Sequence, residues 1–477
     1  MDARSERNAV PLAVDLDGTL IATDLLWESL FLLLRRKPYC LFLLPFWLLG
    51  GKARLKCAIA ERVELDPASL PYRQDLLARL REDKADGRHV VLATAAPKKF
   101  AEAVAAHLGV FDSVISTEPG RNMASHVKRE ALIAAFGDGG FDYAGNSRAD
   151  VAVFDAARQA IVVAPDRAAA RWHEANGGEL FSAEKPTLKT HFKMLRAHQW
   201  LKNTLIFVPL ILDHDYFDPY MMGLGLLAFI AFSFSASAIY ILNDFFDLAL
   251  DRRHPTKSKR PFASGVLSIP FGFAAMIGLL AVSGFVATFL PPLFGLVLFG
   301  YLLATTAYSL SIKRMLLVDV LTLAGLYTMR ILAGSAATGI GVSFWLLAFS
   351  VFFFLSLALV KRYVELRSTE LPTGERIAGR GYRSEDQEVI AQAGMASAFS
   401  AAMVLALYIQ SSAVRELYSQ PWLIWPLCPI VLYITIRIWV LARRNEMHDD
   451  PIVFIISDWR SQLVGGFGAF LLFYAGL

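Results

Sequence analysis

The chain has 477 residues, enough for two or three domains, and its formal net charge of +4 gives no reason to expect nucleic acid as a partner. Charged and apolar residues mix up to about residue 200, as in a soluble domain, whereas long apolar runs recur beyond it. The three cysteines, Cys40, Cys57 and Cys428, are spaced for neither a zinc site nor a disulfide framework.

Residues 10–20 predict a buried strand that ends in a tight acidic turn. Asp15 and Asp17 are two residues apart, so they point the same way from the strand end. One carboxylate can act as a nucleophile and form an aspartyl-phosphate, and a second acid beside it can protonate the leaving oxygen. The pattern favours phosphate chemistry at this turn.

Residues 25–71 are typical of a helical cap. Within them, residues 38–49 are strongly apolar but too short to cross a bilayer. Two interpretations stay open: this segment packs inside the cap, or the cap rests on the membrane and admits a lipid-linked phosphate.

Polar residues follow the next predicted strands. Residues 89–94 form a strand that ends at Thr94, Lys128 precedes an amphipathic helix, and residues 141–150 give a strand and a turn containing Asp150. Alternating strands and helices predict an α/β domain with a parallel sheet covered on both faces. Its polar residues are expected to gather at the carboxyl ends of the strands.

The order of these motifs resembles the haloacid dehalogenase superfamily of phosphohydrolases over residues 10–170. The resemblance implies catalytic and phosphate-binding roles for four side chains: Asp15 as nucleophile, Asp17 as acid/base, and Thr94 and Lys128 as phosphate ligands. It also implies Mg²⁺ bound by Asp15 and Asp150. Asn146 stands where the family usually has an aspartate, and the lost negative charge should weaken that site. A degenerate, regulatory or structural domain therefore stays open as the alternative to a phosphatase.

Residues 181–202 alternate cations with apolar residues and predict an amphipathic helix on the membrane surface, with a plain linker as the alternative. They separate a domain of residues 1–180 from a membrane domain of residues 203–477. Nine apolar runs approach the roughly 20 residues that a spanning helix needs: 203–219, 221–242, 269–289, 292–310, 316–337, 342–360, 390–411, 421–441 and 461–477. The first is weak because Asp213, His214 and Asp215 interrupt it.

The cations between these runs favour one orientation. They cluster at residues 252–260, 313–314, 361–383 and 443–444, on one alternating set of loops, and the opposite set holds only Arg415. The positive-inside rule therefore predicts a multi-pass protein of the cytoplasmic membrane, with the N-terminal domain in the cytoplasm and the C-terminus outside.

The run that ends at residue 242 leads into Asn243, Asp244, Asp247 and Asp251, and five cations follow. On one helix the three aspartates would lie within about 60° of arc. Like charges so close repel unless a divalent cation lies among them, and Mg²⁺ prefers a few carboxylates together with phosphate oxygens. Asn243 can hydrogen-bond a water or phosphate oxygen nearby. The alternative is an acidic helix end that the following arginines neutralise.

Asp319 lies a few residues into the apolar run at 316–337, where a lone carboxylate needs a partner. Lys313 or a shared metal is expected to supply it. Two further polar sets, at residues 361–365 and 449–458, fit solvated loops at least as well as ligand roles.

The motif at residues 243–251 and the predicted helical bundle resemble the UbiA-type intramembrane prenyltransferase superfamily over residues 190–477. Residues 196–203, 251–261 and 308–313, with Asp319, are most similar to its decaprenyl-phosphate phosphoribosyltransferase branch, which serves cell-wall arabinan biosynthesis. The resemblance implies phosphoribosyl pyrophosphate as donor and polyprenyl phosphate as acceptor in the lipid bilayer. The N-terminal domain would then offer removal of the 5′-phosphate, and a homo-oligomer stays open.

The same resemblance implies the roles of the polar residues. Mg²⁺ would lie on Asp244, Asp247 and Asp251, and catalysis is assigned to Asp244, Asp247 and Asp319. Substrate binding is assigned to seven residues: Lys202, Asn203, Asn243, Lys257, Arg260, Tyr308 and Lys313.

Two other functions stay open. One is prenyl transfer from a prenyl diphosphate to an aromatic or other small acceptor. That branch usually carries a second Asp-x-x-x-Asp, whereas Leu323 stands four residues after Asp319. The other is a transporter or scaffold with a sensor domain, whose charges would line a path across the bilayer instead of clustering at cytoplasmic helix ends.

Overall fold

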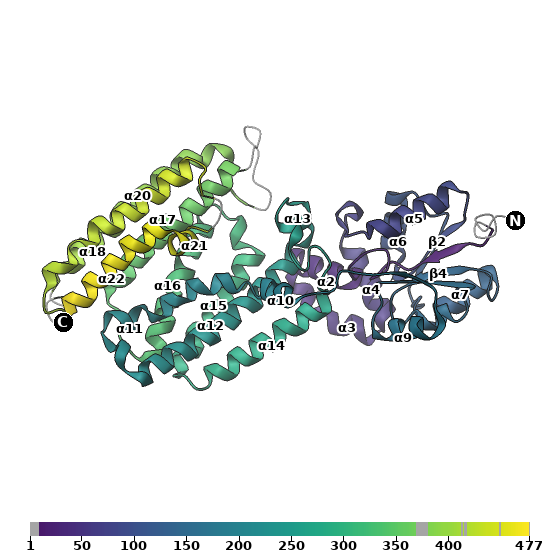
Figure 1. Ribbon diagram of the computed structural model, residues 1–477, viewed down its shortest axis with the longest axis horizontal. Coiled ribbons are helices and arrows are strands. Elements are labelled where there is room, and N and C mark those ends of the chain that lie inside the picture. Colours follow the sequence, from purple (N-terminus) through teal and green to yellow (C-terminus); the bar gives the residue numbers. More distant parts are fainter. Residues whose placement is uncertain (1–8, 369–379, 412–413, 415–416, 448–449, 477) are drawn as a thin grey trace. The chain divides into compact units, whose positions relative to one another are not determined.

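The computed structural model describes residues 9–368, 380–411, 414, 417–447 and 450–476 (Figure 1). Arg415 and Asp449, on which two expectations above partly rest, lie outside the described residues. The chain divides into two compact units. The sheet unit comprises Met1–Met194 and Ile241–Ala275, and the helical unit comprises Leu195–Tyr240 and Met276–Leu477.

Six parallel strands form the centre of the sheet unit, in the order β3-β2-β1-β4-β5-β6. They are β1 (Leu12–Val14), β2 (Val90–Pro97), β3 (Ser113–Thr117), β4 (Asp142–Gly145), β5 (Gln159–Val163) and β6 (Glu179–Phe181). Leu12 and Val14 of β1 face one apolar core and Ala13 faces another. Since successive side chains of a strand point to opposite faces, burial on both sides requires the unbroken apolar sequence found here. The predicted α/β fold is confirmed.

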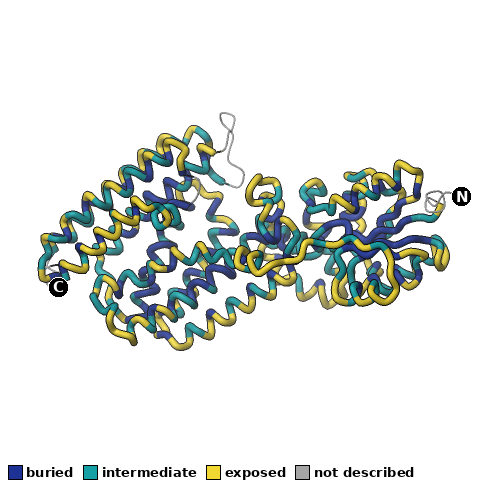
Figure 2. The backbone as a smooth tube through the Cα atoms, in the orientation of Figure 1, coloured by how far each residue is buried: buried dark blue, intermediate teal, exposed yellow. Residues whose placement is uncertain are grey.

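Helices cover both faces of this sheet. The core on the Leu12 side includes residues of α5 (Gln74–Ala85) and α6 (Lys98–Leu108). The core on the Ala13 side includes residues of α7 (His126–Phe136), α8 (Val151–Phe154) and α9 (Arg167–Asn176). Figure 2 shows the strands as the most deeply buried backbone of this unit.

The predicted cap lies between β1 and α5. It contains α2 (Leu25–Arg36), η1 (Pro38–Leu43), α3 (Leu44–Leu49), α4 (Lys52–Arg62) and η2 (Pro67–Ser69). Asp24 precedes α2 as its N-cap, and its carboxylate accepts a hydrogen bond from the backbone N–H of Leu26 at 2.8 Å. The sheet unit also contains the end of α12 (Pro219–Phe246), α13 (Leu248–Arg253), η5 (Lys257–Lys259) and the start of α14 (Ile269–Ala287).

The helical unit is built from long apolar helices with short connections. Beyond α12 and α14 these are α15 (Pro292–Leu310), α16 (Val318–Thr338), α17 (Phe344–Ser368), α18 (Gln387–Ile409), α20 (Leu427–Arg443) and α22 (Trp459–Gly476). Shorter elements of this unit are η3 (Ala197–Phe207), α11 (Val208–Leu212), η4 (Asp215–Phe217), η6 (Ile312–Arg314), η7 (Ser384–Asp386), η8 (Pro421–Ile424) and α21 (Pro451–Ser457). The short helix α10 (Leu188–Leu195) belongs to the sheet unit except for its last residue. The segment predicted as an amphipathic linker is α10 and the first half of η3, and Leu188 and Phe192 are exposed on α10.

Within the described residues, seven helices are long and apolar enough to cross a membrane, so the prediction of nine is wrong. The run at residues 203–219 is divided among η3, α11 and η4, because Pro209 and the polar residues from Asp213 onward interrupt it. The run at 461–477 belongs to α22, which has only 18 residues and carries the polar Arg460, Ser461 and Gln462 in its first turn. The other seven runs correspond to candidate spans.

Candidate active sites

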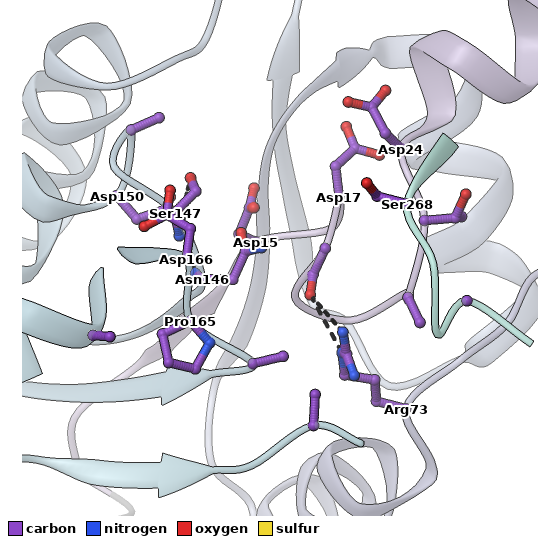
Figure 3. Close-up of a pocket in the computed structure, with 18 of the residues that line it drawn as sticks. Asp15, Asp17, Asp24, Arg73, Asn146, Ser147, Asp150, Pro165, Asp166 and Ser268 are labelled. Atoms are coloured by element: carbon purple, nitrogen blue, oxygen red, sulfur yellow. Dashed lines mark hydrogen bonds between the residues drawn. The ribbon is translucent and has the colours of Figure 1, made fainter. Parts of the chain in front are cut away.

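The carboxyl ends of the strands in the sheet unit line a cavity of about 1080 Å³. Asp15 and Asp17 follow β1, Asn146 follows β4, and α7 contributes Lys128. Figure 3 shows Asp15, Asp17 and Asp150 around this space. Thr94 is fully buried on β2, and its hydroxyl oxygen accepts a hydrogen bond from the backbone N–H of Ala96 at 3.0 Å.

Lys128 joins two of the predicted acidic residues. Its Nζ lies 2.7 Å from Asp15 Oδ1 and 3.2 Å from Asp150 Oδ1, and all three side chains are buried. Asp150 also accepts hydrogen bonds from the Tyr143 hydroxyl at 2.6 Å and the Ser147 hydroxyl at 2.8 Å. Burial would raise the pKa of Asp150, but Lys128 and these hydrogen bonds outweigh it, so the pKa is lowered.

Asp15 and Asp17 are protonated more readily than ordinary carboxylates. Burial raises the pKa of Asp15 to about 6, although Lys128 opposes the rise. Burial, and then the neighbouring charges of Asp24 and Asp15, raise the pKa of Asp17 well above its usual range. Asp17 is also fixed in position, because its Oδ1 accepts the backbone N–H of Leu25 at 2.9 Å. A carboxyl group that holds its proton can act as a general acid.

Asn146 lies against the tight turn after β1. Gly18 adopts φ +76° there, and a Cβ at that position would lie 2.2 Å from Asn146 Nδ2. Asp15, Asn146 and Asp150 all line this cavity, and their side chains carry the hard oxygen atoms that Mg²⁺ prefers as ligands. The set has one negative charge fewer than three carboxylates would give.

Several residues of this cavity had no sequence signal. Lys56, on the cap helix α4, donates to the Ala95 carbonyl at 2.7 Å. Arg73, labelled in Figure 3, donates to the Gly18 carbonyl at 3.3 Å. A lysine in a cap helix looks like any solvated cation, so only the fold assigns it to the cavity.

The segment at residues 264–270, which follows the basic loop of the membrane-domain motif, forms another part of the cavity wall. Gly265 adopts φ +77°, and a Cβ there would lie 2.4 Å from the Ala22 carbonyl oxygen. Close approach of the two backbones therefore requires glycine at this position.

The motif at residues 243–251 differs from the single helix expected. α12 ends at Phe246 and α13 begins at Leu248, so Asp247 lies at a break between two helices. Arg260 binds Asp251 at 2.6 Å and Asp244 at 3.3 Å. Asp247 instead lies 3.4 Å from Arg35 of the cap helix α2. The prediction that the three carboxylates share one face of a single helix is therefore wrong. A helix break interrupts the motif, and Arg260 binds two of the carboxylates while Arg35 lies beside the third.

The donor set nevertheless fits Mg²⁺. Asp244 and Asp251 are buried, and Asn243 Oδ1 is buried without a hydrogen-bond partner in the described part of the chain. Among all the residues that the structure describes, no three or more His, Cys, Asp or Glu side chains are grouped closely enough to hold a metal ion. Mg²⁺ commonly takes one or two protein carboxylates and completes its shell with phosphate oxygens and water. Lys257 of η5, predicted to bind phosphate, is exposed to solvent.

A second charged cluster lies inside the helical unit, and we call Lys202, Asn203, Arg330, Lys361 and Asp450 the Lys202 cluster. Asp450 Oδ2 lies 2.5 Å from Lys202 Nζ and 3.2 Å from Lys361 Nζ. Arg330 Nε donates to Asn203 Oδ1 at 2.9 Å. Three cations thus accompany one carboxylate in a largely buried group, which suits an anionic ligand. Lys202 and Asn203 were predicted from the sequence, whereas Arg330 was missed.

Asp319 has a partner that was not anticipated. It is fully buried, lies 2.6 Å from Arg362 Nη2 of α17, and accepts a hydrogen bond from the Tyr382 hydroxyl. The expectation of Lys313 or a metal as its partner is corrected to Arg362. Two other predicted residues contact Arg380, which donates to the Tyr308 hydroxyl at 3.2 Å and to the Lys313 carbonyl at 3.5 Å.

Comparison with known proteins assigns both parts of the chain. Residues 204–457 match the UbiA prenyltransferase family. The chain belongs to this family. Residues 12–155 match the haloacid dehalogenase-like hydrolases, so this family member carries a haloacid dehalogenase-like N-terminal domain. Both resemblances inferred from the motifs are confirmed, and the chain is a multi-pass membrane transferase.

Individual relatives cover different parts of this UbiA family member. The uncharacterized protein y4nM of Sinorhizobium fredii is 39% identical over 96% of this chain and 89% of its own length. Decaprenyl-phosphate phosphoribosyltransferase of Mycobacterium tuberculosis is 35% identical, over 37% of this chain and 60% of that enzyme. A solved UbiA homolog from Archaeoglobus fulgidus bound to GPP and Mg²⁺ aligns with 60% of this chain and 99% of its own, at 15% identity and a TM-score of 0.46.

Proposed function

We propose that the membrane domain transfers phosphoribose from phosphoribosyl pyrophosphate to a polyprenyl phosphate. The observation that carries the proposal is the excess of positive charge in the Lys202 cluster, where three cations accompany one carboxylate. A phosphoribosyl donor brings a 5′-phosphate as well as a diphosphate and needs more cations than a prenyl diphosphate. Leu323, at the place of a second acidic motif, supports the same choice. So does the similarity to the mycobacterial enzyme.

The transfer step exchanges one bond at the ribose C1. A phosphate oxygen of the acceptor forms a bond to C1, and the bond from C1 to the diphosphate oxygen breaks through an oxocarbenium-like state. The acceptor oxygen is already anionic, so the step needs no strong general base. The products are polyprenyl-phosphoryl phosphoribose and pyrophosphate.

The acidic motif would bind the leaving diphosphate. Asp244 and Asp251, with Asp247, would hold Mg²⁺, which supplies charge neutralisation to the leaving group when it is bound. Arg260 holds Asp244 and Asp251 in the structure and would offer its guanidinium to a phosphate once the carboxylates have another cation. Asn243 Oδ1, buried and without a partner among the described residues, would accept from a water in the same shell.

The N-terminal domain would then remove the 5′-phosphate of the product. Asp15 attacks the phosphorus to form an aspartyl-phosphate, Asp17 gives its proton to the leaving ribose oxygen, and water releases inorganic phosphate. The raised pKa of Asp17 supports its role as the acid. The product of this second step would be a lipid-linked pentose donor of the kind that arabinan synthesis uses.

We also infer from the loop charges that the N-terminal domain lies on the cytoplasmic side of the cytoplasmic membrane.

The transfer is tested with purified protein in lipid nanodiscs that contain polyprenyl phosphate. Phosphoribosyl pyrophosphate labelled in the ribose should label the lipid fraction in the presence of Mg²⁺, and Asp244→Asn should not support labelling. Parallel reactions receive a labelled prenyl diphosphate and aromatic acceptors. Label that enters only these acceptors would overturn the phosphoribosyl assignment in favour of prenyl transfer.

The second step is tested by mass spectrometry of the lipid product. Asp15→Asn should accumulate the phosphorylated lipid, whereas the unaltered protein should accumulate its dephosphorylated form. An unchanged ratio of the two lipids would show that the N-terminal domain does not act on this product.

A further inference from the structure

The cap of the sheet unit presents an apolar surface formed by η1 and α3, residues 38–49, which we call the cap ridge. Cys40 and Trp47 point into the domain core, and most of the other large side chains face outward. Phe42 is 76% exposed, Phe46 67% and Leu49 86%. Packing inside the cap, one of the two interpretations open from the sequence, does not account for these exposed side chains, since burying large apolar groups drives folding.

The ends of two candidate membrane spans lie directly beside the preceding cap helix, within the same compact unit. Phe31 of α2 packs against Phe245 at the end of α12, with ring centroids 4.7 Å apart. Trp27 of α2 packs against Phe273 in the first turns of α14 at 5.2 Å. Arg35 Nη1 donates to the carbonyl of Phe246, the last residue of α12, at 2.7 Å. A single residue, Lys37, separates α2 from the cap ridge, so the ridge begins a few residues after the contact between Arg35 and the end of α12.

The charge around the cap ridge suits the surface of an anionic membrane. Residues 29–60 contain no Asp or Glu, and cations flank the ridge on both sides: Arg35, Arg36 and Lys37 before it, Lys52 and Arg54 after it. Arg36, Lys52 and Arg54 are exposed. Basic residues beside a bilayer are attracted to anionic headgroups.

We infer that the cap ridge lies in the interfacial region of the lipid bilayer and attaches the phosphohydrolase cap to an anionic membrane surface. At about 20 Å of helical rise the ridge is too short to span the roughly 30 Å hydrocarbon core, so it lies along the surface. The neighbouring helix α4 carries Lys56 into the phosphohydrolase cavity. One wall of that cavity is therefore held at the membrane, where a lipid-linked phosphomonoester would be presented. This last consequence rests on the proposed function, whereas the attachment does not.

Depth-dependent quenching tests the attachment in the full-length protein. Single cysteines at Phe42→Cys and Leu49→Cys carry a small fluorophore, with Ala106→Cys on the exposed surface of α6 as the matched control. Only Cys57 needs replacement, by serine, because Cys40 and Cys428 are buried. In liposomes containing phosphatidylglycerol, we expect doxyl-labelled lipid to quench the fluorophore at positions 42 and 49. We expect iodide, which stays in water, to quench the fluorophore at position 106 at least threefold more strongly than at positions 42 and 49.

Two outcomes would overturn the inference. Equal iodide quenching at all three positions would show that the ridge faces water. Protection of positions 42 and 49 from both quenchers would show that a protein, or a second copy of this chain, covers it.

A second pair of variants tests the consequence for the cavity. Phe42→Glu with Leu49→Glu should leave hydrolysis of soluble p-nitrophenyl phosphate unchanged and reduce dephosphorylation of the lipid-linked product at least fivefold, and Ala106→Glu should change neither. If the unaltered protein dephosphorylates no lipid, the proposed second step fails while the quenching result still decides the attachment. If the double variant dephosphorylates the lipid normally, the cap ridge does not present it.

Discussion

Arg252 and Glu28 form a buried, two-pronged ion pair that joins the membrane-domain motif to the phosphohydrolase cap. Arg252 Nη2 lies 2.5 Å from Glu28 Oε1 and Arg252 Nη1 lies 3.0 Å from Oε2, with side chains only 8% and 9% exposed. Arg252 directly follows Asp251, the last carboxylate of the motif, and Glu28 lies in the first turn of α2. The loop after the motif and the cap are therefore parts of one folded unit, as the division of the chain also shows.

Loss of this pair should destabilise the sheet unit. Arg252→Met leaves the Glu28 carboxylate buried without its partner, which typically costs about 3–5 kcal/mol. The neighbouring Arg253 pairs with Asp66 at the surface, where the two side chains are 66% and 40% exposed, so Arg253→Met should cost less than about 1 kcal/mol. Pulse proteolysis across a urea series in detergent micelles measures both. Equal effects of the two variants would contradict a structural role for the buried pair.

Arg260 should compete with a divalent cation for the acidic motif. Because its guanidinium contacts both Asp244 and Asp251, Arg260→Gln should tighten metal binding, and at the same time raise the KM for phosphoribosyl pyrophosphate by removing a phosphate ligand. Binding of Mn²⁺, followed by electron paramagnetic resonance, measures the first effect without any turnover. Arg253→Gln, close in sequence but paired elsewhere, should alter neither quantity. Weaker Mn²⁺ binding in Arg260→Gln would mean that the arginine organises the carboxylates for the metal.

The sequence predicts those features that depend on local pattern. Continuous apolar strands followed by acidic turns indicate the parallel sheet and its phosphate chemistry, and the Asn243-Asp244 motif indicates the membrane family. The helix break at Asp247 has no such signal, since the surrounding Phe-Phe-Asp-Leu-Ala-Leu carries neither proline nor glycine. The expectation of one acidic face failed for that reason.

Interaction partners that lie far apart along the chain could not be predicted from the sequence either. Asp450 binds Lys202 across a separation of 248 residues, and Asp319 pairs with Arg362 on the next helix. Charges at the ends of apolar runs look alike whether they are solvated or buried, so the tertiary packing decides which of them meet. The exposed cap ridge illustrates the same limit, because an apolar segment too short to span gives no indication of which way its side chains face.

Asp319 was predicted to be catalytic, but it also pairs with Arg362 and accepts a hydrogen bond from Tyr382. Variants of this pair can therefore distinguish a catalytic role from a structural one. Arg362→Met leaves a fully buried carboxylate unpaired and should cost about 3–5 kcal/mol of stability. The double variant Asp319→Leu, Arg362→Met removes both charges of this pair. Arg362 also contacts Glu365, but that carboxylate keeps its contact with Arg380, so the double variant should recover most of the loss. Pulse proteolysis follows stability, and labelled phosphoribosyl pyrophosphate follows transfer. A stable double variant that still transfers phosphoribose would exclude Asp319 from catalysis, whereas a stable but inactive one would support it.

The affinity of the phosphohydrolase cavity for Mg²⁺ should depend on Asn146. Asparagine and aspartate have the same shape, so Asn146→Asp fits against Gly18, where a Cβ would lie 2.2 Å from the side-chain nitrogen of Asn146. The added negative charge gives Mg²⁺ a third carboxylate in the cavity of Asp15 and Asp150, and should lower the Mg²⁺ concentration for half-maximal hydrolysis of p-nitrophenyl phosphate about tenfold. Asn146→Ala should raise that concentration, and Asn146→Asp combined with Asp15→Asn should be inactive if the activity belongs to this cavity. If Asn146→Asp has the unaltered Mg²⁺ dependence, residue 146 does not bind the metal, and the asparagine reflects its packing against the turn at Gly18.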